Sequence, residues 1–214
     1  MAGVKLNLVA AVIVNTDKVH MKAIILLATL KKQGLSNTAV LSEFFREKLL
    51  GHGISCEIIR LVNHRILPGT YSDMGEGDEW PDILNKIMAA DLVLFATPIW
   101  WNNFSSEMQK VIERLDHLHD GILEGRPSPL EGKVGGILIT GDSDGAQQII
   151  GGIANFFNAI GLVLPPFASL SVLWEGQRKG ADTPREELLV KYREYESNAE
   201  TMISQLKAYA LNSR

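Results

Sequence analysis

From residue 21 onward, short apolar runs alternate with segments in which apolar side chains recur every three or four residues. The apolar runs are residues 23–28, 56–61, 92–97, 133–140 and 162–174. Strands that are buried on both sides form continuous apolar runs, and the helices that cover them carry an apolar stripe. The alternation therefore predicts an α/β fold, a doubly wound parallel sheet of five strands with helices on both faces.

The connecting segments supply the helices of this fold. We expect helices at residues 40–49, 83–88, 108–118, 149–160 and 184–209, and a long loop at residues 62–79. The charged run at residues 185–200 is typical of a solvated helix face. No repeat or linker divides the chain, so residues 21–214 are predicted to form one domain after an N-terminal extension at residues 1–20.

Composition excludes several classes of function. The net charge of -4 offers no broad basic field for a nucleic-acid backbone, so no nucleic-acid partner is expected. The single cysteine, Cys56, cannot form an intramolecular disulfide or supply the four thiolates of an iron-sulfur cluster. We expect a buried strand residue at Cys56 and a cytoplasmic protein.

Two apolar stretches resemble membrane signals only in part. Residues 145–174 carry no charge, but their glycines, prolines and asparagines favour a buried helix followed by a buried strand, so no membrane partner is expected. Residues 8–14 form an apolar run behind a single lysine, which makes a poor signal peptide. For residues 1–20 an extra edge strand, a flexible extension and an upstream start codon all stay open.

Ligands of doubly wound sheets bind beyond the carboxyl ends of the strands, so the loops there are the candidate site. The first loop, residues 29–38, is rich in hydroxyl and amide groups and leads into a helix start, where an anion is favoured. Its candidate phosphate-binding residues are Thr29, Lys31, Ser36, Asn37 and Thr38. The loop lacks the P-loop motif, and simple capping of the helix by Ser36 or Asn37 is the alternative.

The second loop, residues 97–106, contains two tryptophans in tandem. Trp100 and Trp101 form a flat apolar surface suited to a planar ring, and Asn102 and Asn103 add amide groups beside it. The alternative is a structural role, with one tryptophan at the sheet edge or a dimer contact and Ser105 as a helix cap.

The third loop, residues 140–146, has glycines that permit a close backbone approach. Its N–H groups suit the carbonyl edge of a ring. A dinucleotide-binding fingerprint is disfavoured, because Gln147 stands where the last glycine of that motif belongs. No metal site is expected: His117 and His119 are two residues apart and point to different sides of a helix, so we interpret them as histidines at a helix C-terminus.

Together the three loops resemble those of the flavodoxin-like NAD(P)H-dependent FMN reductases and their quinone-reductase relatives, over residues 21 to about 211. The most specific similarity is the run Thr97-Pro98-Ile99-Trp100-Trp101, followed by residues 110–115, Lys-Val-Ile-Glu-Arg-Leu, which resemble the family's Lys-x-Phe/Val-Ile/Leu-Asp/Glu-Arg helix pattern. In the first loop Ala28 and Lys31 replace the family's glycine and arginine, whereas Ser36, Asn37 and Thr38 match.

The resemblance implies a flavodoxin-like sheet of order 2-1-3-4-5 that binds FMN. It places the phosphate at Ser36, Asn37 and Thr38 with help from Thr29 and Lys31. The remaining cofactor-binding residues that it implies are Pro98, Ile99, Trp100 and Trp101 along the ring, Asn102 and Asn103 at its N5/O4 edge, and Thr140, Gly141, Asp142 and Gly145 near its N1/O2/N3 edge.

The same resemblance implies an FMN-dependent oxidoreductase that passes electrons from NAD(P)H to a quinone, a flavin or another small acceptor. The cofactor supplies the chemistry, so no catalytic side chain is expected. A homodimer or homotetramer is also implied. A flavodoxin-type electron carrier is the alternative, although carriers are usually more acidic than a net charge of -4. A third possibility is a flavodoxin-like interaction module that binds no flavin.

Overall fold

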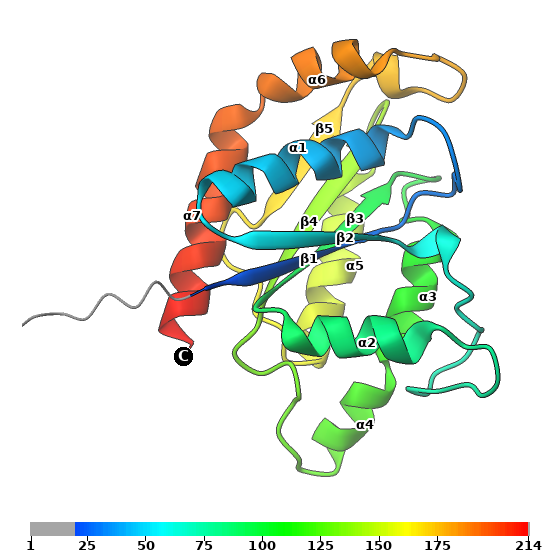
Figure 1. Cartoon of the computed structure of the whole chain (residues 1–214), viewed down its shortest axis with the longest axis vertical. Coiled ribbons are helices and arrows are strands. Elements are labelled where there is room, and N and C mark those ends of the chain that lie inside the picture. Colours follow the sequence, from blue (N-terminus) through cyan, green and yellow to red (C-terminus); the bar gives the residue numbers. More distant parts are fainter. Residues whose placement is uncertain (1–19, 214) are drawn as a thin grey trace, which may run out of the picture.

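Five parallel strands form the central layer of the chain, and Figure 1 shows them between two groups of helices. In this computed structural model, which describes residues 20–213, the strands are β1 (Lys22–Leu27), β2 (Ser55–Arg60), β3 (Leu92–Pro98), β4 (Val134–Gly141) and β5 (Ser169–Leu173). Their order is β2-β1-β3-β4-β5, and all neighbours are parallel. The predicted flavodoxin-like order is confirmed. The predicted extension at residues 1–20 lies outside the described residues except for His20.

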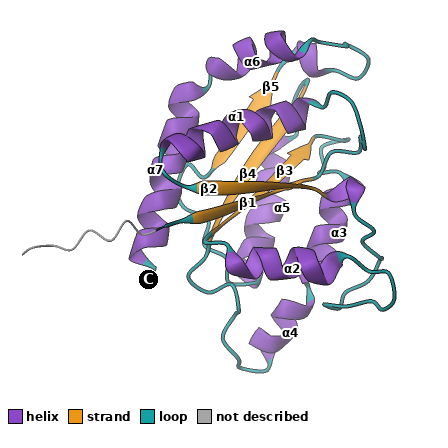
Figure 2. Cartoon of the chain, viewed as in Figure 1, coloured by secondary structure: helices purple, strands orange, loops and turns teal. Residues whose placement is uncertain are grey.

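Helices cover both faces of the sheet (Figure 2). One face packs against α1 (Asn37–Gly51), α6 (Arg185–Arg193) and α7 (Glu196–Asn212), and the other against α2 (Trp80–Ala89), α3 (Ser106–Leu115) and α5 (Ala146–Ala159). A short helix, α4 (His117–Leu123), follows α3. Along β1, Ile25 and Leu27 enter the first core and Ile24 and Leu26 the second, which is the alternation of a strand buried on both sides.

Two predicted helices are in fact pairs of helices. The helix expected at residues 184–209 is interrupted at residues 194–195 between α6 and α7: both pack on α1, but α7 also packs on β4 and β5. The helix expected at residues 108–118 ends at Leu115, and α4 begins at His117. The spacing of apolar residues is helical on both sides of each break, so it does not predict where one helix ends and the next begins. The tertiary structure shows these breaks.

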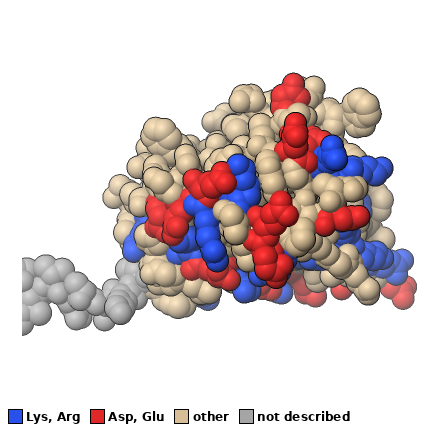
Figure 3. All heavy atoms as spheres, turned by 90° about the horizontal axis from the view of Figure 1, so that it is seen from above, with Lys and Arg blue, Asp and Glu red and all other residues tan. Residues whose placement is uncertain are grey.

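The fifth strand lies within residues 162–174, as predicted. Only β5 is strand, and the uncharged stretch at residues 145–174 is divided among α5, an irregular connection and β5. Within residues 20–213, no helix is long and apolar enough to cross a membrane. On the face that is uppermost in Figure 1, acidic and basic side chains are interspersed (Figure 3).

A buried ion pair organises the long loop at residues 62–79. The guanidinium of Arg114 donates to both carboxylate oxygens of Asp78, at 3.0 and 2.6 Å, and to the carbonyl oxygens of Leu67 and Tyr71. Both charged side chains are fully buried. Because each charge has several partners, the pair anchors this loop to α3 and offers nothing to a ligand.

Candidate functional site

A pocket of about 970 Å³ opens at the carboxyl ends of the strands. Its walls come from the loops after β1, β3 and β4 and from residues 176–183 after β5, all on the right-hand side of Figure 1. We call it the carboxyl-end pocket. The predicted site residues that line it are Thr29, Lys31, Ser36, Asn37, Thr38, Pro98, Ile99, Trp100, Trp101, Asn102, Thr140, Gly141 and Asp142.

The first loop ends in a helix start whose hydroxyl groups are already positioned. Ser36 is the N-cap of α1: its Oγ accepts from the N–H of Ala39 at 3.3 Å and donates to Oγ1 of Thr29 at 2.8 Å. Oγ1 of Thr38 lies 2.7 Å from Oγ1 of Thr140, which joins the first loop to β4. Within the described chain, the N–H groups of Asn37 and Thr38 have no acceptor and so remain available to an anion.

The second loop turns sharply at its tryptophans. The N–H and carbonyl groups of Trp100 and Asn103 bond to each other at 2.7 and 2.9 Å, with Trp101 and Asn102 between them at φ of 50° and 60°. This turn usually takes glycine or asparagine, so holding a tryptophan in it stores backbone strain. The side chain of Trp101 is 96% exposed at the pocket wall. Such strain typically occurs where a side chain is presented for binding.

Asn103 and Gly145 do not line the carboxyl-end pocket. Oδ1 of Asn103 accepts from the N–H of Phe104 at 2.9 Å. A Cβ on Gly145 would lie 2.7 Å from Oδ1 and 2.9 Å from Cα of Asn102, and the φ of Gly145 is +102°. Glycine at this position thus lets the third loop pack against the second. Ser105 is a helix cap, as in the structural alternative: its Oγ accepts from the N–H of Met108.

The fourth wall, residues 176–183, was missed by sequence reasoning. Its anchor is Gln177, whose Nε2 donates to the carbonyl oxygens of Gly141 and Val172 at 2.8 and 2.7 Å. Nδ2 of Asn37 donates to the carbonyl oxygen of Gln177 at 3.0 Å. The signal was available: a Gly-Gln-Arg-Lys-Gly run follows the fifth strand, and all parallel strands end at the same edge.

Tyr192 of α6 holds Gln177 and the first loop together through hydrogen bonds. Its hydroxyl lies 2.9 Å from Oε1 of Gln177 and 3.0 Å from the carbonyl oxygen of Asn37. The ring is fully buried, and burial raises the pKa of the hydroxyl above its usual range, so it stays protonated and able to donate. The first loop, the third loop and residues 176–183 are thereby joined in one hydrogen-bonded network.

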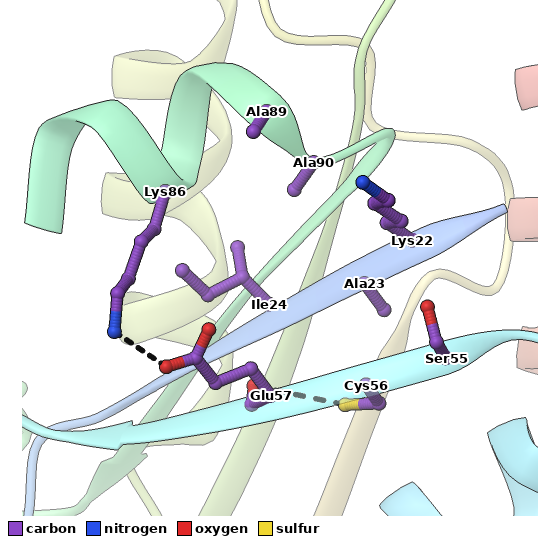
Figure 4. Close-up of a pocket in the computed structure, with 9 residues that line it drawn as sticks. All are labelled: Lys22, Ala23, Ile24, Ser55, Cys56, Glu57, Lys86, Ala89 and Ala90. Carbon is purple, nitrogen blue, oxygen red and sulfur yellow. Dashed lines mark hydrogen bonds and ion pairs between the residues drawn. The ribbon is translucent and has the colours of Figure 1, made fainter.

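A second hollow, of about 370 Å³, lies at the amino ends of β1 and β2 beside α2 (Figure 4). We call it the amino-end hollow. Across it, Nζ of Lys86 lies 2.6 Å from Oε1 of Glu57. Cys56 also lines it; burial, opposed by the charge of Arg46, raises the pKa of its thiol to about 12. Lys86 and Glu57 neutralise each other and the thiol is protonated, so this hollow carries little reactive chemistry.

His117 and His119 do not end their own helix, because they lie in the first turn of α4, yet both rings contact carbonyl oxygens at the C-terminal ends of other helices. Nδ1 of His117 lies 2.9 Å from the carbonyl oxygen of Arg114 in the last turn of α3, and Nδ1 of His119 lies 2.9 Å from that of Ala159 at the end of α5. Among residues 20–213, no three His, Cys, Asp or Glu side chains lie together in a way that could hold a metal ion.

The sheet order and the pocket at its carboxyl edge define a flavodoxin-like protein. A flavodoxin from Streptococcus pneumoniae TIGR4 shares the fold, with a TM-score of 0.53 at 17% identity over 87% of this chain and 98% of that chain. The profile of the NADPH-dependent FMN reductase family matches residues 21–172. The chain therefore belongs to that family.

Curated relatives extend the similarity. The 8-demethyl-8-aminoriboflavin-5'-phosphate synthase of Streptomyces davaonensis is 33% identical over 165 residues, covering 70% of this chain and 62% of that protein. The divalent metal cation transporter MntH of Mycobacterium bovis is 32% identical over 162 residues, covering 73% of this chain but 23% of the transporter. The chain thus spans less than two thirds of the length of these relatives.

A solved structure is also similar. RosB with the bound intermediate 8-demethyl-8-formylriboflavin-5'-phosphate superimposes with a TM-score of 0.73 at 26% identity. The match covers 89% of this chain and 79% of RosB.

Proposed function

We propose that this protein is an FMN-dependent oxidoreductase that passes electrons from NAD(P)H through bound flavin to a small acceptor such as a quinone or free flavin. The observation that carries the proposal is the carboxyl-end pocket, which combines a helix start with free N–H groups and a wall of tandem tryptophans. Such a pocket suits a ligand with an anionic end and a flat apolar end.

The residues fit FMN at both ends. The free N–H groups of Asn37 and Thr38 offer donors to a phosphate, as does the hydroxyl of Thr29, which accepts from Ser36 and Lys31, and Lys31 adds a positive charge at the rim. Ile99, Trp100 and Trp101 provide the apolar surface for the ring. The similar structure of RosB, which holds a bound riboflavin-5'-phosphate derivative, supports a ligand of this chemical type.

In this proposal the side chains of the protein position the flavin and do not react themselves. Bound FMN supplies a ring that accepts a hydride and then gives up its electrons. Around it, the network of Asn37, Gln177 and Tyr192 keeps the loops in place, and the buried hydroxyl pair of Thr38 and Thr140 fixes the floor. We assign no side chain to proton transfer, because cofactor chemistry of this kind needs none.

An assembled form is part of the proposal. Exposed apolar side chains surround the pocket mouth, namely Leu30, Leu35, Trp100 and Trp101. Covering such a rim is favourable, so we propose a homodimer or homotetramer. Size-exclusion chromatography with light scattering tests it, and a monomer at micromolar concentration contradicts it.

One experiment separates the oxidoreductase from its alternatives. The purified protein is examined for flavin absorption and then assayed for NAD(P)H oxidation with a quinone or free flavin as acceptor. A yellow protein with turnover supports the proposal, and a yellow protein without turnover supports an electron carrier. A colourless protein that does not quench the fluorescence of added FMN supports an interaction module instead.

A further inference from the structure

Two basic side chains on the fourth wall have no partner in the described chain. Arg178 and Lys179 are exposed and line the carboxyl-end pocket, and neither makes a hydrogen bond or ion pair through its side chain within residues 20–213. Other cations of the same face are paired: Arg185 lies 2.9 Å from Glu43, and Lys191 lies 2.6 Å from Glu194. The fourth wall therefore presents two cations that have no ion-pair partner among the described residues.

These two cations project from a backbone that is held in place. In Figure 1 their segment is the orange loop between β5 and α6. Gln177 bonds to Gly141 and Val172, the N–H of Arg178 donates to Glu175, and that of Ala181 donates to Arg178. A ligand that binds here orders only side chains, because the loop is already ordered, and this lowers the entropic cost of binding.

The charge exceeds what the FMN phosphate needs. The first loop already offers two free N–H groups, a hydroxyl and Lys31 to that phosphate. On the fourth wall Asp182 offsets one of the two cations, yet together with Lys31 this side of the pocket stays net positive. Asp142 and Asp144 make the third loop negative, so a second anion is favoured at the fourth wall and repelled from the third loop.

We propose that Arg178 and Lys179 form a second anion subsite that binds a phosphate monoester of the electron donor, namely the 2'-phosphate of NADPH. The inference rests on the proposed function. A phosphate monoester carries about two negative charges at pH 7, whereas a carboxylate carries one. The phosphate therefore matches the charge of the two cations better than a carboxylate does. NADH lacks this group. The subsite lies beyond residues 21–172, the part of the chain that matches the family profile.

The test compares two double variants with the same change in net charge. Arg178→Gln/Lys179→Gln removes the subsite, and Arg193→Gln/Lys207→Gln removes two cations that do not line the pocket. Each protein is titrated calorimetrically with adenosine 2',5'-bisphosphate and with adenosine 5'-monophosphate. Both titrations are done once in the presence of FMN and once without added flavin. We expect the wild type and the control to prefer the bisphosphate by about tenfold or more, and the subsite variant to lose that preference.

Kinetics and flavin binding complete the test. The ratio of kcat/KM for NADPH to that for NADH should fall about tenfold in the subsite variant and stay unchanged in the control. Equal affinity of the wild type for both nucleotides, or a preference that survives in the subsite variant, overturns the proposal. So does a loss of affinity for FMN but not for riboflavin, since the cations would then bind the flavin phosphate. A wild type that binds no FMN refutes the proposed function separately.

Discussion

The carboxyl-end pocket and the amino-end hollow lie at opposite ends of the same strands, yet they differ in what they leave unsatisfied. At the pocket α1 begins, and the N–H groups of Asn37 and Thr38 have no acceptor. At the hollow α2 ends, and Nζ of Lys133 caps it by donating to the carbonyl oxygens of Met88 and Ala90 at 2.7 and 2.8 Å. A free helix start attracts a ligand, whereas a capped helix end does not.

If ligand binding depends on the groups left free at the pocket, then a change in a buried ion pair elsewhere should alter the stability of the fold and not the affinity for FMN. The largest such effect is expected at the buried pair of Asp78 and Arg114. Asp78→Asn leaves Arg114 charged and buried, so we expect the free energy of unfolding to fall by about 3–5 kcal/mol. Urea denaturation measures the loss. The FMN affinity of the folded fraction should not change, because neither residue lines the pocket. A loss below about 1 kcal/mol contradicts the structural role.

The same pair predicts a pH dependence. Burial alone would raise the pKa of Asp78, but hydrogen bonds from Arg114 and from the N–H groups of Met74, Leu67 and Trp80 outweigh it and lower the pKa to about 2. Because the folded-state pKa lies below the unfolded one, about 2 kcal/mol of stability is present above pH 4 and is lost as the pH falls toward 2. Asp78→Asn should lack this part of the acid dependence, and an identical acid profile would refute it.

Next in size is the aromatic wall of the carboxyl-end pocket. Trp100→Ala should weaken FMN binding by about 1–3 kcal/mol, because it removes a stacking surface. Fluorescence titration measures the affinity. Trp100→Phe keeps a ring and should lose less, and Trp101→Ala shows how much the exposed neighbour contributes. Unchanged affinity in a folded Trp100→Ala protein would mean that the tandem tryptophans are structural.

A variant at the start of α1 tests whether the phosphate of FMN binds there. Ser36→Ala removes the N-cap of α1 and should cost about 1 kcal/mol of stability. It should also weaken FMN more than riboflavin, since riboflavin has no phosphate. Ser105→Ala is the matched control: it removes the buried N-cap of α3, which does not line the pocket. Equal losses for FMN and riboflavin in Ser36→Ala would place the phosphate elsewhere.

The smallest effects are expected at the amino-end hollow. Lys86→Gln breaks a half-exposed ion pair and should change stability by less than about 1 kcal/mol, with no effect on FMN affinity. Cys56 should react slowly with iodoacetamide at pH 7, because a pKa of about 12 leaves almost no thiolate. Mass spectrometry after timed alkylation checks this. Altered FMN affinity in Lys86→Gln would show that the two ends of the sheet are coupled.

The sequence could predict the sheet far better than the site. Continuous apolar runs located β1, β3 and β4, because strands buried on both faces exclude polar side chains. The boundary between α6 and α7 could not be predicted, since both have helical periodicity and only their packing partners differ. Asn103 and Gly145 have the residue types of a ligand-binding loop, but their neighbours give them structural contacts.

Residue order alone was enough to show that this chain builds a doubly wound sheet with polar loops at one edge, because burial and turn chemistry are written locally in side-chain type. Tertiary structure decided which groups are left free. It pairs Glu57 with Lys86 and Asp78 with Arg114, yet leaves Arg178 and Lys179 unpaired beside the helix start of α1. Whether a polar group can bind a ligand depends on its partners, and those partners come from distant parts of the chain.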